Sequence, residues 1–160
     1  MRSDRRACSA SGYGVSAPIC RDERVNLAHL VTRCMARWGL DEMTQARLLG
    51  YDTTHTGRVA RHRKGSPIRN NVDALRRVSL LLAVHGGLKA LFESDTVRMR
   101  VWLQSPCRML NDQSPIQWAT TSMLGLYDIA NHLKDLIEEG DQGEQATQGR
   151  RARRRRNIQD

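Results

Sequence analysis

The sequence predicts an all-α fold, because apolar residues recur along this 160-residue chain at spacings of three and four, as on one face of a helix. Aromatic residues make up only 4% of the chain. The core must therefore consist of Leu, Val, Ile, Met and Ala, which suits helices packed on helices better than a β-sandwich. No segment alternates apolar and polar residues convincingly as a strand does, and there is no internal repeat. We expect a compact helical bundle flanked by disordered tails at residues 1–20 and 141–160.

The first predicted helix begins near Asp22 and ends at Gly39. Its apolar stripe consists of Leu27, Leu30, Val31, Cys34, Met35 and Trp38. A second, shorter helix is predicted from Glu42 to Leu49, with Asp41 as its N-cap and Gly50 as its end. A third is expected to run from Asp52 or Thr53 to about Gly65.

A long fourth helix is predicted to follow Ser66 and Pro67, which have the form of an N-cap followed by proline at the first helical position. Its apolar residues are Ile68, Val72, Leu75, Val78, Leu81, Leu82, Leu88, Leu91 and Phe92. The pair Gly86–Gly87 interrupts this stripe, so we expect a kink or a close helix crossing there. His85 is expected to be a packing residue of this helix.

Ser94 is expected to cap the next helix, with Val97, Val101, Trp102 and Leu103 facing inward. The helix stops at Pro106, and a loop leads to Ser114 and Pro115. A polar loop rarely holds several apolar residues and two prolines unless it packs against something. The stretch from residue 101 to 116 also follows a helix-turn-helix-like segment in a strongly basic chain. Together, the two features indicate a DNA-binding protein with a second, partner-binding module.

Two helices are predicted after this loop. Ser114 and Gln117 have the spacing of a capping box, with Pro115 inside it. A final helix starts near Gly125 and closes at Gly140. Its stripe consists of Leu126, Ile129, Ala130, Leu133, Leu136 and Ile137.

The charge of the chain is unevenly placed. The net charge is +9, but six arginines lie between residues 150 and 156, and without them about +3 remains. Such a balance favours polyanionic partners, yet it is modest evidence for nucleic-acid binding by the folded part. The arginine-rich tail is interpreted as a solubilising end that also attracts DNA non-specifically; a localisation signal and a docking segment remain alternatives.

No metal site, cofactor or catalytic residue is expected. The four cysteines show no C-x-x-C pair and the five histidines no ligand spacing. Gly86–Gly87 lacks the Lys-Ser/Thr of a phosphate loop, and no carboxylates are paired in a way that suggests a pocket. With no apolar run long enough for a bilayer, a cytoplasmic, nucleoid-associated protein with reduced thiols is expected.

A helix-turn-helix is indicated by Ala46 and Gly50. The motif needs a small residue where two helices cross and a residue that tolerates positive φ in the turn. Tyr51 and Val59 stand at the apolar anchor positions. The recognition helix would run from Thr53 to Lys64, with base contacts near its start and phosphate contacts near its end. The predicted DNA-binding residues are Thr53, Thr54, His55, Arg58, Arg61, Arg63 and Lys64. An αα-corner with a basic face is the alternative.

From about residue 42 to residue 140 the chain resembles the MbcA/ParS/Xre antitoxin family. The resemblance is carried by Arg47-Leu48-Leu49-Gly50, by the segment from Leu82 to Phe92, by Trp102-Leu103-x-x-Pro106, by Ser114-Pro115-Ile116 and by the closing helix. It implies a DNA-binding part at residues 21–66 and a helical toxin-binding part at residues 67–140.

The resemblance also implies a function and partners. Such an antitoxin covers the active site of a toxin, commonly a RES-domain enzyme that degrades NAD or an ADP-ribosyl-transferring enzyme, and the complex represses its own operon. A homodimer within a hetero-oligomeric complex is implied, with operator DNA as the second partner. A stand-alone repressor without a toxin is the alternative function.

The predicted toxin contact centres on the loop between the two prolines. The predicted residues are Trp102, Pro106, Met109, Leu110, Ser114 and Pro115, within a contact region at residues 98–140. Apolar and adaptable side chains of this kind are enriched at interface centres. Trp102 is interpreted as a core residue rather than an interface residue. Met109 and the rest of the loop are interpreted as part of the interface.

Overall fold

The computed structural model describes residues 19–52 and 57–156, with side chains as far as residue 140. Its elements are α1 (Arg21–Arg37), α2 (Glu42–Leu48), α3 (Gly57–Arg63), α4 (Val72–Phe92), α5 (Thr96–Gln104), the 3-10 turn η2 (Arg108–Leu110), α6 (Pro115–Thr121) and α7 (Met123–Arg156). Within the described residues, the only extended pairing is an isolated bridge between Cys107 and Gln113. The predicted all-α fold is confirmed.

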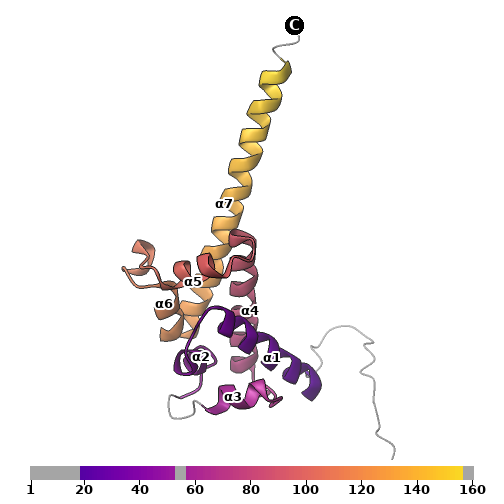
Figure 1. Cartoon of the computed structure of the whole chain (residues 1–160), viewed down its shortest axis with the longest axis vertical. Coiled ribbons are helices and arrows are strands. Elements are labelled where there is room, and N and C mark those ends of the chain that lie inside the picture. The colour runs from indigo at the N-terminus through magenta and orange to yellow at the C-terminus, as the bar shows by residue number, and fades with distance from the viewer. Residues whose placement is uncertain (1–18, 53–56, 157–160) are drawn as a thin grey trace, which may run out of the picture.

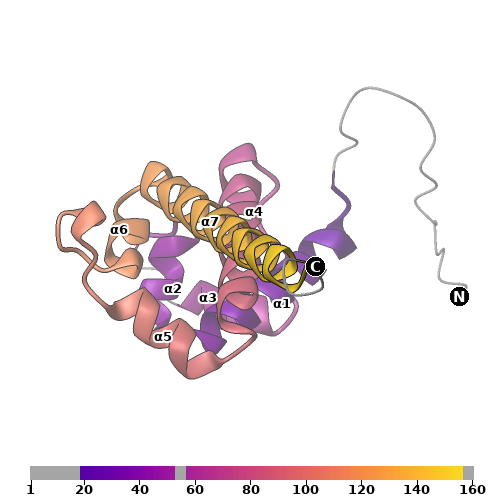
Figure 2. The same ribbon diagram turned by 90° about the horizontal axis from the view of Figure 1, so that it is seen from above.

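The helix α4 lies at the centre of the fold, between α1 on one side and α5 and α7 on others (Figures 1 and 2). Arg76 of α4 lines the same space as Met123 of α7, and further along Gly87 lies against Leu133, so the two helices run in the same direction. A single core of buried apolar side chains extends from Ala28 in α1 to Leu133 in α7. The N-terminal and C-terminal parts therefore share one core.

The pair Gly86–Gly87 produces a close crossing and no break in α4, which is continuous through it. A Cβ on Gly87 would come within 3.0 Å of the Leu133 Cβ, whereas one on Gly86 would meet open space. The missing side chain at Gly87 lets α7 approach α4, and this helix contact is the most extensive in the molecule. His85 packs from α4 against the buried Trp38, with ring centroids 6.1 Å apart.

The start of α4 differs from the prediction. Its N-cap is Asn71, whose side chain accepts a hydrogen bond from the Ala74 N–H at 2.8 Å, and Ser66 and Pro67 precede the helix. The intervening Ile68 is buried, and its backbone exchanges hydrogen bonds with Arg24 of α1, N–H to O at 3.2 Å and O from Nη1 at 2.8 Å. These hydrogen bonds to α1 keep the residues around Ile68 extended, so α4 begins only at Val72.

The start of α5 also differs. Asp95, not Ser94, caps the helix, because its carboxylate accepts from the backbone N–H groups of residues 97 and 98. Ser94 instead adopts a positive φ of 69° in the turn after α4. Val97 and Val101, predicted to face inward, are 69% and 59% exposed, while Leu103 is buried as expected.

The last helix begins at Met123, two residues before the prediction, and continues through Gly140 to Arg156. The predicted stop at Gly140 is wrong, because the residues that follow are rich in Gln, Glu, Ala and Arg, which favour helix. No helix in the described part of the chain has the length and apolar content that crossing a bilayer requires.

Candidate nucleic-acid and protein interfaces

The segment α2–turn–α3 has the local chemistry of the predicted helix-turn-helix. Ala46 is fully buried and Gly50 has a positive φ of 73°. The N–H of Tyr51 donates to the Ala46 carbonyl at 2.9 Å, which closes the turn. The anchors Tyr51 and Val59 are both buried. Positive φ is accessible to glycine without a Cβ clash, which is why the turn requires Gly50.

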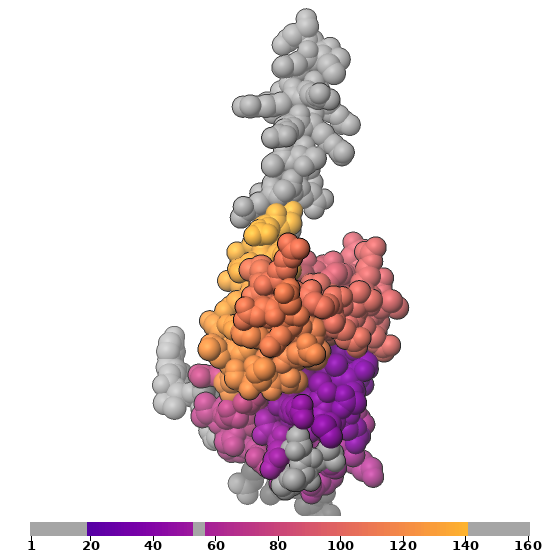
Figure 3. All heavy atoms as spheres, turned by 90° about the vertical axis from the view of Figure 1, so that its left-hand side faces the viewer, coloured from indigo at the N-terminus to yellow at the C-terminus, as the bar shows by residue number. Residues whose placement is uncertain are grey.

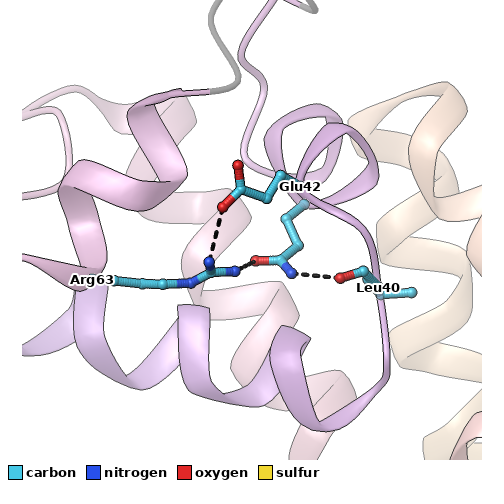
Figure 4. Close-up of polar contacts among 4 residues, drawn as sticks. Leu40, Glu42 and Arg63 are labelled. Carbon is cyan, nitrogen blue, oxygen red and sulfur yellow. Dashed lines mark hydrogen bonds and ion pairs between the residues drawn. The ribbon is translucent and has the colours of Figure 1, made fainter.

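A polar network joins α2 to α3 (Figure 4). The guanidinium of Arg63 donates to Glu42 Oε1 at 2.9 Å and to Gln45 Oε1 at 3.0 Å. The buried Gln45 side chain in turn donates from Nε2 to the Leu40 carbonyl at 2.6 Å. Satisfying a buried amide in this way fixes the angle between the two helices.

The predicted DNA-binding residues fall into three groups. Thr53, Thr54 and His55 lie outside the described residues. Arg61 on α3 and Lys64, directly after this helix, are exposed, as the prediction requires. Arg58 is half-buried over the Tyr51 ring, and the guanidinium of Arg63 is engaged in the network with α2.

A buried Tyr51–His62 pair lies behind these arginines. The Tyr51 hydroxyl donates to His62 Nε2 at 2.7 Å, and His62 Nδ1–H donates to the Ser66 carbonyl at 2.8 Å. The rings are stacked, with centroids 5.6 Å apart. Burial lowers the pKa of His62 and raises the pKa of Tyr51. Both shifts favour the neutral forms, which this hydrogen-bond pattern also requires.

Arg69 is a member of this region that the sequence did not indicate. Its Cζ lies 4.9 Å from the Tyr51 ring centroid, beside Arg58 at 5.4 Å. It lies beyond the predicted recognition helix, on the extended segment before α4. Its position follows from the hydrogen bonds between Ile68 and Arg24 of α1, two residues that are 44 apart in the chain.

The predicted toxin-binding loop projects from the body of the protein between α5 and α6 (Figure 1). Leu110, Ser114 and Pro115 are buried, whereas Pro106 is exposed and Met109 is 76% exposed. The Cys107 N–H donates to Gln113 O at 3.0 Å, closing the loop. The capping box of Ser114 and the start of α6 at Pro115 are as predicted. Buried residues thus anchor a loop that holds Met109 outward.

Trp102 is half-buried and lies on the side of α5 that faces the core. Its ring lies 6.5 Å from Phe92 of α4 and stacks 6.3 Å from His132 of α7. This placement agrees with the reading that the side chain fills the core. The second tryptophan, Trp118, donates from Nε1 to Asp128 Oδ2 at 3.1 Å, joining α6 to α7.

An apolar groove runs between α4 and α7, and the sequence did not indicate it. Its larger part has a volume of about 660 Å³ and is lined by Leu80 and Ala83 of α4 and by Leu124 and Tyr127 of α7, among others. A second part of about 450 Å³ continues it toward Ile137. Leu124 is 68% and Tyr127 is 51% exposed at this groove. We call it the α4–α7 groove.

The space-filling view of Figure 3 shows the face that carries α6 and the loop before it, with the N-terminal helices directly below. On α5, Val97 and Val101 are one turn apart and both exposed. They lie on the helix that leads into the loop. No group of three or more potential metal ligands gathers among the described residues.

Two comparisons relate the chain to known proteins. Residues 87–136 match the family described as the antitoxin Xre/MbcA/ParS C-terminal toxin-binding domain. The chain also superposes on a chain of the crystal structure of the M. tuberculosis MbcT–MbcA toxin–antitoxin complex, with a TM-score of 0.52 and 19% identity. That match covers 71% of this chain and 95% of the other, and at this identity it supports the fold. No curated protein matches the chain.

Proposed function

Since this chain belongs to the Xre/MbcA/ParS antitoxin family through a toxin-binding domain at residues 87–136, we propose that it neutralises a partner toxin by covering the toxin's active site. The partner is an enzyme of the RES-domain type that degrades NAD, or a related ADP-ribosyl-transferring enzyme. This chain itself acts by binding, without a catalytic step, in the cytoplasm and at the nucleoid.

The observation that carries the proposal is the exposure of Met109 on an anchored loop. Burial of Leu110, Ser114 and Pro115 fixes the loop, so presenting Met109 to a partner costs little conformational entropy. Pro106 lies exposed in the same loop. An exposed thioether among apolar neighbours is adaptable and suits the centre of a protein interface. Trp102, half-buried on α5, packs against Phe92 of α4 and His132 of α7.

Co-expression with the product of the adjacent gene tests this role. The toxin alone should arrest growth and deplete NAD, and the wild-type chain should prevent both and co-purify with the toxin. The variant Met109→Asp should bind the toxin at least tenfold more weakly and no longer co-purify with it, because it buries a charge at the interface. Leu30→Asp, an exposed leucine on α1 outside the toxin-binding domain, is the matched control and should protect. A Met109→Asp chain that protects as well as wild type would contradict the proposed contact.

We further propose that the α2–α3 unit binds operator DNA and that the complex represses its own operon. The support is the turn at Gly50, the buried anchors, the exposed Arg61 on α3 and the exposed Lys64 directly after it. Thr53, Thr54, His55 and Arg58 are proposed for base contacts, with Arg61, Arg63 and Lys64 on phosphates. Arg63 would contact a phosphate while it also holds Glu42.

Fluorescence anisotropy with the DNA upstream of the gene tests the second role. Sequence-selective binding by the chain, strengthened by the toxin, is expected. Selective binding with no toxin gene beside it would favour the stand-alone repressor. Equal binding to every duplex would contradict operator recognition.

The implied homodimer is proposed to form across the α4–α7 groove. Arg76 lies at one end of the groove and Glu138 at the other, on helices that run in the same direction. A two-fold axis through the middle, near Tyr127, would therefore place Arg76 of one copy beside Glu138 of the second. Light scattering should give a dimer for wild type and a monomer for Tyr127→Glu. A monomeric wild type would contradict this arrangement.

A further inference from the structure

A small polar pocket lies between α3 and the extended segment before α4. Its volume is about 110 Å³, several times the roughly 10–15 Å³ that one water requires. Three arginines line it, Arg58, Arg61 and Arg69, together with Tyr51 and His62. We call it the arginine pocket. Asp52 follows Tyr51 in the chain but is not part of the lining.

Three guanidinium charges gather in the arginine pocket. Within the described ranges, the ion pairs involve other cations, and the arginines of the pocket make none. Arg58 and Arg69 both lie over the Tyr51 ring, and Arg61 donates from Nε to the Gly57 carbonyl at 3.4 Å. Like charges held this close repel one another, so an anion between them would be strongly attracted.

The guanidinium of Arg58 is partly desolvated. Its Nε is inaccessible to solvent and finds no hydrogen-bond acceptor among the described residues. A cation that loses water without gaining an acceptor is destabilised, so a countercharge in the pocket that it lines would stabilise it. An oxyanion supplies that countercharge.

The remaining walls of the pocket are neutral and rigid. Tyr51 and His62 use their polar atoms on each other and on the Ser66 carbonyl. Burial lowers the pKa of His62, so the imidazole adds no charge at neutral pH. Tyr51 provides a flat surface that orients two guanidinium groups toward the same space. The selectivity of the pocket therefore comes from the arginines alone.

We infer that the arginine pocket binds a phosphate group, which in the DNA complex is a phosphate of the duplex backbone. Planar guanidinium groups match tetrahedral phosphate oxygens by paired, charge-assisted hydrogen bonds. The inference rests on the proposed DNA binding for the source of the phosphate and adds Arg69 and Tyr51 to the contact surface. Because Arg69 precedes α4, the phosphate would connect the DNA-binding part to the central helix.

The first experiment uses inorganic phosphate and the full chain, with no DNA. At constant ionic strength, phosphate should raise the melting temperature above that in chloride and broaden the ³¹P signal. Arg69→Gln should lose both effects. The matched control is Arg98→Gln, an exposed arginine of α5 paired with Asp95, which should retain them. Equal responses of wild type and Arg69→Gln to phosphate would overturn the pocket as a phosphate site.

The second experiment measures duplex binding between 50 and 200 mM salt. Arg69→Gln should weaken binding to every duplex alike and reduce the slope of log K against log salt by about one. An unchanged slope and affinity would overturn the backbone phosphate as the occupant. If the chain binds no DNA but phosphate still depends on Arg69, the proposed DNA binding fails and the pocket stands as a site for free phosphate.

A conservative variant covers the case in which Arg69→Gln does not fold, as judged by circular dichroism. Arg69→Lys keeps the cation but lacks the guanidinium fork. It should keep the salt slope and lose severalfold in affinity for DNA, along with most of the phosphate-dependent stabilisation. Wild-type values for Arg69→Lys in both measurements would contradict recognition by paired hydrogen bonds.

Discussion

Replacing Gly125 with alanine should destabilise the corner between α6 and α7 more than any other single methyl addition at a described helical glycine. A Cβ at this position would lie 2.3 Å from the Trp118 carbonyl oxygen. Ordinary carbon–oxygen contacts are about 3.3–3.6 Å, so the two segments would have to separate by about 1 Å. The carbonyl cannot easily withdraw, because it accepts a hydrogen bond from the Thr121 hydroxyl at 2.7 Å.

The expected cost follows from comparison with overpacked cores. Inserting a methyl group into a filled site costs typically 1–3 kcal/mol, and the rigid backbone neighbour places Gly125→Ala near the upper end, at about 3 kcal/mol. For a chain of this size the melting temperature should fall by roughly 10 °C. Thermal unfolding followed by circular dichroism, with urea titration for the free energy, measures the change.

Gly86→Ala is the matched control, because it makes the same change inside a helix where the new methyl meets open space. Alanine is favoured over glycine in a helix interior, so this variant should gain about 0.5–1 kcal/mol. The two variants should thus differ in sign. If Gly125→Ala melts at the wild-type temperature, the close packing of α6 on α7 is wrong, and with it the anchoring of the loop that carries Met109.

Three further predictions concern the core, the α2–α3 junction and pH. Leu88→Ala, at a fully buried position of α4, should cost about 2–5 kcal/mol in urea unfolding, and a cost below 1 would contradict its burial. Arg63→Ala should cost about 1–2 kcal/mol, because it leaves the buried Gln45 oxygen without its donor, and Arg63→Lys should recover part of it; equal losses for both would exclude the charge-assisted bond. Since burial lowers the pKa of His62 below its ordinary 6.5, the unfolded chain takes up the proton first. The unfolding free energy should therefore fall as pH drops through 6.5 to the folded pKa, and His62→Gln should flatten this dependence; a wild-type slope in that variant would refute it.

Local signals in the sequence predicted most of the helices. Asp41 and Ser114 cap helices as expected, and Gly50 has the positive φ that its turn was predicted to need. These features depend on hydrogen bonds and backbone conformation within three or four residues, so the sequence alone contains them. The exposed Met109 and the buried core stripe of α7 follow from the same local patterns.

The errors occur where contacts between distant residues overrule a local signal. Ser66 and Pro67 have the form of a helix start. Ile68 is nevertheless hydrogen-bonded to Arg24, and the helix begins only after the N-cap Asn71. Likewise a nine-residue helix such as α5 presents apolar residues on more than one side. Which side is buried depends on where α4 and α6 lie.

The helical class, most of the caps and turns, and the place of the loop between the two prolines could be predicted from the sequence, since each depends on near neighbours in the chain. Only the tertiary structure brought Arg69 beside Arg58 over Tyr51, opened the α4–α7 groove and turned Val97 outward. The physical reason is that a surface consists of residues from several helices. Its composition depends on how the helices pack, as at the contact that Gly87 allows between α4 and α7.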